Sequence, residues 1–197
     1  MQGQVAVLSL PQLARDLDDP RDEDGRRYAA AITAFLKTAD TGKACWIVDL
    51  RGHAGGNMWP GLRGLAPLLG RGSPGAFVTA SGRQPWPATP SATRGALWSA
   101  DAPMAVLLGP RTASSGEMIA ISLVGRPATR SFGQPTAGLS TANSSYPLSD
   151  GALLAVTSSY VEDRLGHRYD GRMIPDETVA LDGAEQAALA WLATQGC

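Results

Sequence analysis

The sequence contains few of the residues that several classes of protein require. Its 197 residues include two cysteines and two histidines, and the formal net charge is −1. Two cysteines cannot form a disulfide framework, and mixed charges without a basic stripe argue against a nucleic-acid partner. No apolar run is long enough to span a membrane. Because His, Cys, Asp and Glu residues do not recur at metal-ligand spacing, we also expect no metal and no cofactor.

The cysteines and the start of the chain leave the cellular compartment open. Cys45 begins an apolar run, where a free cysteine would behave as a small hydrophobic residue, and Cys197 is the last residue and is expected to be exposed. In an oxidising compartment the two could instead form a disulfide. Residues 1–13 lack the basic region and apolar core of a signal peptide, so none is predicted.

The apolar pattern predicts an α/β fold. Short apolar runs typical of strands alternate with segments whose apolar residues recur at helical spacing. The expected strands are 5–10, 45–50, 76–79, 104–108, 129–132 and 153–160, and the expected helices are 26–39, 58–69, 114–124 and 184–193. This alternation favours a mainly parallel central sheet with helices on its faces. Asp150-Gly151 predicts a late β-hairpin, and residues 1–197 are expected to form a single domain.

One serine lies in a turn of small residues between an expected strand and an expected helix. Residues 110–120 read Pro-Arg-Thr-Ala-Ser-Ser-Gly-Glu-Met-Ile-Ala. Such a turn can expose the oxygen of Ser114, and the helix start supplies unpaired N–H groups and a partial positive charge that suit an oxyanion. The same residues fit a capping box between Ser114 and Glu117, which needs no catalysis. Both interpretations are open at this point.

Two further turns with glycine follow apolar strands. They are Asp-Leu-Arg-Gly-His-Ala-Gly-Gly-Asn at 49–57 and Gly-Gln-Pro-Thr-Ala-Gly at 133–138. Paired glycines let backbone N–H groups approach a ligand, although a tight turn explains them equally. No lysine followed by Ser or Thr, and no three-glycine dinucleotide spacing, supports nucleotide binding. In an open parallel sheet, turns of this kind gather at the carboxyl ends of the strands, where sites form.

Four motifs together resemble one known family. They are Asp-Leu-Arg-Gly-x-x-Gly-Gly at 49–56, Thr-Ala-Ser-x-x-Glu at 112–117, Gly-x-Pro-Thr-x-Gly at 133–138 and Ile-Pro-Asp at 174–176. Their order and spacing resemble the tail-specific, or C-terminal processing, serine peptidases. The likeness is greatest to the branch that holds the tricorn core, the retinoid-binding-protein repeats and the nisin-resistance peptidases. The resemblance implies a crotonase- or Clp-protease-like β/α spiral, a peptide or protein substrate, and a place in the cell envelope or outside the cell.

The resemblance also assigns roles to residues of these motifs. It makes Ser114 the nucleophile that forms an acyl-enzyme. The N–H of Ser114 and that of Gly55 or Gly56 would form the oxyanion hole. Glu117 matches the acidic residue one turn into the helix, for which we expect a capping and orienting role rather than proton transfer.

Two departures from the family concern the catalytic base. Position 139, 25 residues after Ser114, holds the lysine base of the processing branch, but here it is Leu139, so the base is expected to be a histidine. The tricorn-like and nisin-resistance branch carries its histidine before the first motif, where this sequence has none. Three sources remain: His53 in the glycine turn, His167, or an N-terminal cap segment that the relatives carry and this chain is expected to lack.

These departures keep other interpretations open. A non-catalytic or incomplete peptide- or lipophile-binding module on the same fold is the main alternative, and a crotonase-fold thioester enzyme is less favoured. Glu162 and Asp163 are adjacent near a strand end, so we expect their carboxylates to point apart in a solvated loop. The tryptophans that could line a peptide groove are Trp59, Trp86 and Trp98, although core packing is favoured for Trp59.

Overall fold

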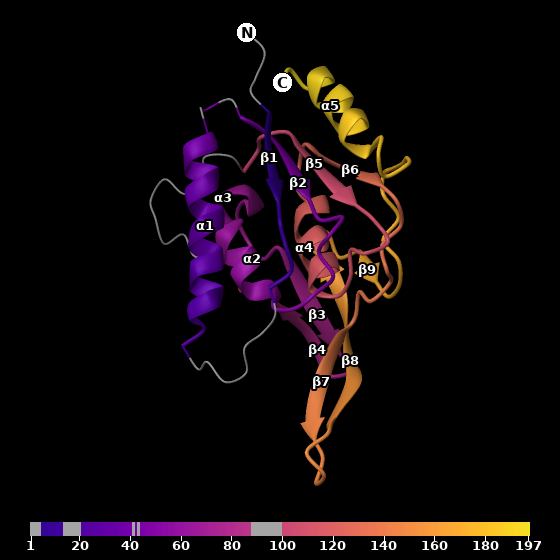
Figure 1. Ribbon diagram of the computed structural model, residues 1–197. Coiled ribbons are helices and arrows are strands. Elements are labelled where there is room, and N and C mark those ends of the chain that lie inside the picture. The colour runs from indigo at the N-terminus through magenta and orange to yellow at the C-terminus, as the bar shows by residue number, and fades with distance from the viewer. Residues whose placement is uncertain (1–4, 14–20, 41, 43, 88–99) are drawn as a thin grey trace.

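The computed structural model describes residues 5–13, 21–40, 42, 44–87 and 100–197. Helices and strands alternate along much of this chain (Figure 1). The helices are α1 (Glu23–Ala39), α2 (Met58–Gly64), α3 (Ala66–Leu69), α4 (Ser115–Val124) and α5 (Ala184–Thr194). The strands are β1 (Val5–Ser9), β2 (Cys45–Asp49), β3 (Gly75–Thr79), β4 (Gly82–Pro85), β5 (Met104–Leu108), β6 (Thr129–Gly133), β7 (Ala142–Pro147), β8 (Leu153–Asp163), β9 (Arg168–Tyr169) and β10 (Glu177–Thr178). In the described ranges, no helix combines the length and the apolar character that crossing a membrane requires.

Five strands form a parallel sheet in the order β1-β2-β5-β6-β10. Because side chains alternate along a strand, Trp46 and Val48 of β2 face one apolar cluster, while Cys45 and Ile47 face another. The first cluster contains residues of α1, α2, α3 and α4, and the second contains residues of α5. The expected parallel sheet with helices on its faces is therefore present, and its central strands are buried on both sides.

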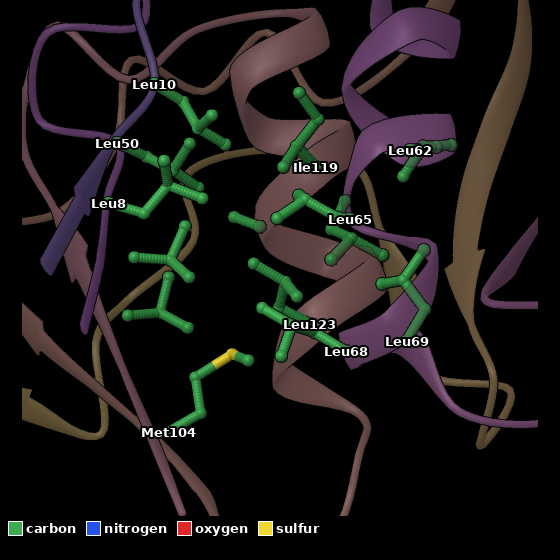
Figure 2. Packing of buried hydrophobic residues seen from close by; sticks show 14 of the residues in the cluster. Leu8, Leu10, Leu50, Leu62, Leu65, Leu68, Leu69, Met104, Ile119 and Leu123 are labelled. Carbon is green, nitrogen blue, oxygen red and sulfur yellow. The ribbon is translucent and has the colours of Figure 1, made fainter. Parts of the chain in front are cut away.

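Helix α4 is the central helix of the fold. Every residue from Ser115 to Leu123 is buried, as expected for a helix enclosed on all sides. Figure 2 shows leucines of α2 and α3 packed against Ile119 and Leu123 of α4. The packing is close enough to require glycine in α2, since a Cβ at Gly61 would lie 2.7 Å from Cδ1 of Ile119. Helix α4 is thus closely packed against α2 in the apolar cluster on one face of the parallel sheet.

A second sheet is antiparallel and has the order β4-β3-β8-β7, with β9 paired to β8. Strands β7 and β8 form a long hairpin that extends away from the rest of the molecule (Figure 1). Its tip is the expected turn at Asp150-Gly151, where the N–H of Leu148 donates to the carbonyl of Ala152. The late hairpin predicted from the sequence is therefore present.

The two cysteines form a disulfide that joins β2 to the C-terminus. Of the two possibilities considered above, the structure contains the bridge and not the free thiols. Cys197 is 8% exposed, so the expectation of an exposed C-terminal cysteine is wrong. It packs with α5 in the apolar cluster beneath the parallel sheet, because the bridge draws the end of the chain onto that face.

Three other expectations need correction. Helix α1 begins at Glu23, three residues before the expected start at 26. The expected helix 58–69 is divided at Leu65 into α2 and α3, with Pro67 in the first turn of α3, where its missing N–H is tolerated. Trp59 is 39% exposed and contacts the ring of Phe77 edge-on, whereas Trp86 is buried. Trp98 lies outside the described residues.

Candidate active site

Ser114 occupies the turn between β5 and α4 in a strained backbone conformation. Its φ of 50° and ψ of −117° fall where residues other than glycine rarely lie. Holding a side-chain-bearing residue in such a region costs on the order of 1–3 kcal/mol, and such strain is concentrated at functional sites. Ser114 is half-buried between the buried Ala113 and Ser115. Ser114 is therefore more accessible than the residues on either side of it, at the start of a buried helix.

The glycine bend after β2 lies directly against Ser114. Gly55 has a φ of 128°, and a Cβ at this position would lie 3.3 Å from Cβ and 3.8 Å from Oγ of Ser114. Gly56 follows with a φ of 107°. The bend is held in place by Asn57, whose N–H donates to the carbonyl of Leu13 at 2.8 Å and whose Oδ1 accepts from the N–H of Trp59 at 3.1 Å. The expected meeting of the bend with the serine turn is thus present.

Glu117 is a completely buried carboxylate with four hydrogen-bond donors. Oε2 accepts from the N–H of Ser114 at 2.9 Å and from the N–H of Leu139 at 2.8 Å. Oε1 accepts from Oγ1 of Thr136 at 2.5 Å and from the N–H of Gly138 at 2.9 Å. These uncharged donors stabilise a charged carboxylate in the interior. The geometry matches the orienting role expected of Glu117, because the carboxylate joins the serine turn to the 133–139 turn.

The N–H of Ser114 takes part in a capping box, which differs from the oxyanion role that the resemblance gave it. In this capping box, one of the two interpretations left open by the sequence, the N–H of Ser114 donates to Oε2 of Glu117 at 2.9 Å. An N–H group that already has this acceptor points away from an incoming carbonyl, so the geometry does not support Ser114 N–H as an oxyanion donor.

Two threonines connect the three turns, a role that the sequence analysis did not assign. Oγ1 of Thr112 donates to the carbonyl of Leu50 at 2.8 Å, which ties the serine turn to the end of β2. Oγ1 of Thr136 donates to Glu117 and accepts from the N–H of Met173 at 2.9 Å. Both threonines are fully buried. Thr112 and Thr136 each belong to one of the four motifs. Their place in the motifs was the only sign in the sequence that they have a role at the site.

Asp49 and Arg51 form an ion pair at the start of the glycine turn. Nε and Nη2 of Arg51 donate to the two carboxylate oxygens of Asp49 at 3.0 and 2.7 Å. These hydrogen bonds raise the pKa of the Arg51 guanidinium. Nη1 of Arg51 also donates to the carbonyl of Leu181 at 2.8 Å, which links the turn to the segment before α5.

His53 lies beneath the serine turn. Its ring is buried against Gly116, where an added Cβ would come within 2.9 Å of Nδ1 and 2.3 Å of the His53 carbonyl oxygen. That carbonyl accepts from the N–H of Ala113 at 3.1 Å. Burial lowers the pKa of the imidazole, and Nδ1 has no hydrogen-bond partner among the described residues. Burial therefore favours the neutral form of the His53 ring at this position.

His167 lies elsewhere, in the turn between β8 and β9. Its Nδ1 is 3.3 Å from Oδ2 of Asp163, and the side chain is largely exposed. Asp163 is buried, and it also accepts from the N–H of Leu165 and from the hydroxyl of Tyr169. Glu162 points in another direction, toward Arg83. The two carboxylates do diverge as expected, but Asp163 braces a tight turn and does not sit in a solvated loop.

The sequence of the chain matches a known family and two known proteins. Residues 4–179 match the family described as peptidase family S41. The chain is 28% identical over 205 residues to the nisin-resistance protein of Lactococcus lactis subsp. lactis, a match that covers 99% of this chain and 62% of that protein. It is 28% identical over 185 residues to a carboxyl-terminal-processing protease of Synechocystis sp., covering 88% of this chain and 42% of that protein. The chain thus spans less than two thirds of each relative.

A solved structure agrees with these matches. The structure of a lipoprotein from Streptococcus agalactiae superposes with a TM-score of 0.82 and 28% identity, covering 99% of this chain and 68% of that chain. The crotonase- or Clp-like α/β fold expected from the sequence is confirmed. The family resemblance inferred from the four motifs is confirmed as well.

Proposed function

Because the chain belongs to peptidase family S41, we propose that it cleaves peptide or protein substrates through an acyl-enzyme on Ser114. Membership supports a serine peptidase in general terms. One observation carries the assignment to this residue: Ser114 is held at a φ of 50° with its side chain against Gly55. A strained serine facing a glycine bend is the arrangement that a nucleophile at a strand-to-helix turn requires.

In the proposed reaction, Oγ of Ser114 attacks the carbonyl carbon of the scissile peptide bond and its proton passes to a base. The tetrahedral intermediate then collapses, and the leaving amine takes the proton from that base. The remaining ester on Ser114 is hydrolysed by water through the same two steps. Neither a metal nor a cofactor has a role in this scheme.

We assign the oxyanion to the N–H of Ser115 together with that of Gly55 or Gly56. Ser115 is the first residue of α4, so its N–H has no acceptor within the helix. The residue after the nucleophile supplies this donor at comparable strand-to-helix elbows. The partial positive charge at the start of α4 adds to the stabilisation of the oxyanion. This assignment replaces the Ser114 N–H, which donates to Glu117.

His53 is the candidate base at the site. Burial lowers its pKa, which keeps the ring in the neutral form that can accept a proton. Its free Nδ1 lies under the serine turn. Among the described residues, however, no hydrogen bond joins the ring to Oγ of Ser114. His53 therefore serves as base only if binding of substrate realigns the two groups, and a residue outside residues 1–197 is the competing source.

Strand β7 supplies a route for the substrate. Within the described chain it pairs only with β8, which leaves its other edge open. It begins at Ala142, three residues after Leu139, whose N–H is bonded to Glu117. An extended peptide can add to such an edge through backbone hydrogen bonds. This mode would lead the peptide toward the serine turn.

The alternative function is a peptide- or lipophile-binding module without turnover. It is favoured by Leu139, which stands where the processing branch has a lysine, and by the lack of a hydrogen-bonded base at Ser114 in the described residues. Ligand binding that persists in Ser114→Ala, with no product formed, would support this alternative.

A fluorophosphonate probe tests the proposed peptidase directly. The wild-type protein is expected to be labelled on Ser114, and Ser114→Ala is expected to lose the label. Ser149→Ala removes an exposed serine at the hairpin tip and is the matched control, which should label normally. An unlabelled wild-type protein that retains its thermal transition would contradict the proposal.

A variant of the histidine tests the base. If His53 accepts the proton, His53→Gln should slow labelling by about 10²-fold or more, which is the usual contribution of a general base. An unchanged rate in a protein of unchanged stability would assign the base to another residue.

A further inference from the structure

Leu139 is an exposed apolar side chain on a backbone that is fixed next to Ser114. Its N–H and the N–H of Ser114 donate to the same oxygen, Oε2 of Glu117, at 2.8 and 2.9 Å. The distance between the two nitrogens therefore cannot exceed the sum of these two hydrogen-bond lengths. The Leu139 side chain is nevertheless 59% exposed.

The backbone around Leu139 has little freedom to move. The preceding Gly138 has a φ of 91° and donates its N–H to Oε1 of Glu117 at 2.9 Å. A Cβ at Gly138 would lie 2.9 Å from Cγ of Arg172, so the aliphatic part of that arginine packs against the turn. Two successive N–H groups thus hold the same buried carboxylate. Leu139 is presented to solvent from a rigid base, which makes it suited to contact a ligand.

On this geometry we infer that Leu139 determines specificity by receiving the substrate side chain on the acyl side of the scissile bond. The inference rests on the proposed function. A reacting carbonyl must lie about 3 Å from Oγ of Ser114, and the side chain in question is attached to the carbon next to that carbonyl. It therefore falls within reach of a residue whose backbone neighbours that of Ser114.

The chemistry of this contact favours an apolar substrate residue. Residues 137–142 read Ala-Gly-Leu-Ser-Thr-Ala and carry no charge. A charged substrate side chain placed against Leu139 would lose hydration without gaining a partner, whereas an aliphatic one gains free energy as both surfaces leave water. Arg172, whose Cγ packs against Gly138, carries a positive charge that would favour an acidic residue instead. A preference of the protein for apolar substrate residues would therefore indicate recognition by Leu139, and a preference for acidic ones would indicate recognition by Arg172.

The substitution needed for the test leaves the scaffold intact. Leu139 contributes its N–H to Glu117, and Leu139→Ala keeps that group. The side chain that is removed is exposed, so little stability should be lost. Leu165→Ala is the matched control, because Leu165 is 69% exposed and lies in the turn between β8 and β9, where it bonds Asp163 through its N–H.

The experiment measures labelling of Ser114 by aminoalkyl phosphonate esters that carry a leucine, lysine or aspartate side chain at the acyl position. In the wild-type protein the leucine analogue should react at least about 10-fold faster than the other two. Leu139→Ala should reduce this preference roughly 5- to 10-fold, as expected for the loss of an aliphatic contact, and Leu165→Ala should preserve it.

Three results would overturn the inference, and they are distinguishable. An unchanged preference in Leu139→Ala shows that another residue sets specificity. Fastest labelling by the aspartate analogue, lost in Arg172→Gln, assigns recognition to Arg172. If neither these esters nor a fluorophosphonate labels Ser114, the proposed peptidase function fails and the inference fails with it.

Discussion

The ring of His53 fills the space that a side chain at position 116 would need. A Cβ on Gly116 would lie 2.9 Å from Nδ1 of His53 and 2.3 Å from its carbonyl oxygen. Both distances are shorter than real Cβ contacts permit. The glycine in the first turn of α4 and the histidine in the bend after β2 are therefore complementary in shape, and they fix how closely the two turns approach.

Gly116→Ala is expected to push these turns apart. The obstacle is a backbone carbonyl, which cannot rotate away, so the free energy of unfolding should fall by about 2 kcal/mol or more, and labelling of Ser114 should slow. Chemical denaturation and probe kinetics measure the two effects. Gly52→Ala is the control from the same bend: no atom lies within 4 Å of its added Cβ, and its stability should change by less than about 0.5 kcal/mol. Equal stability of the two variants would contradict the packing argument.

Glu117→Gln is expected to destabilise the protein. The carboxylate accepts four hydrogen bonds, two at each oxygen. In the glutamine side chain an NH₂ group replaces one of the two acceptor oxygens. The two donors that bonded that oxygen then face another donor and lose their acceptor. Each unsatisfied buried group costs about 1–3 kcal/mol, so a loss of about 2–4 kcal/mol is expected in denaturant melts.

The matched control for that variant is Glu185→Gln. Glu185 lies on α5, about half exposed, with Oε2 3.8 Å from Nη2 of Arg51. A surface pair of this kind contributes about 0–1 kcal/mol. If Glu117→Gln were as stable as this control, the carboxylate would not be what holds the serine turn and the 133–139 turn together.

His53 should make the stability depend on pH. Burial lowers its pKa in the folded protein below the ordinary value of 6.5. The unfolded chain therefore binds a proton at His53 more readily than the folded chain, so protonation favours unfolding. The contribution is absent well above pH 6.5 and grows unfavourable as the pH falls below it. Denaturation at pH 7.5 and 5.5 should show a loss of stability that is smaller in His53→Asn, and identical losses in the two proteins would refute this reasoning.

Reduction of the disulfide should lower stability while leaving the site assembled. Cys45 and Cys197 are separated by 152 residues, and a bridge that closes a long loop commonly contributes about 2–5 kcal/mol. A reductant, or the double substitution Cys45→Ala and Cys197→Ala, should lower Tm by several degrees in calorimetry. Labelling of Ser114 at 25 °C should persist, because none of the hydrogen bonds described for the site involves α5 itself. Loss of labelling in a folded, reduced protein would show that the bridge supports the site.

The sequence predicted best those parts of the structure that a local pattern of residues determines. Buried strands such as β5 are continuous apolar runs, and the Asp150-Gly151 turn has a local chemical signature, so both were predictable. The meeting of the 49–57, 112–117 and 133–138 turns followed from the carboxyl ends of parallel strands lying together.

What the sequence could not reveal depends on directions and on distant partners. The spacing of Ser114 and Glu117 indicated the hydrogen bond between them, but not that Gly138 and Leu139 donate to the same carboxylate. Thr136 joins Glu117 to Met173 across loops that approach only in the folded chain. Cys197 is buried because its partner lies 152 residues earlier, and Trp59 is exposed because α2 presents that position to solvent.

The buried carboxylate of Glu117 also bears on when the Ser114 turn can reach its final geometry during synthesis. Its donors come from residues 114, 136, 138 and 139, so the geometry of the turn is complete only after the last of these segments has left the ribosome and docked. A nascent chain that ends before residue 139 cannot hold Ser114 as the finished protein does.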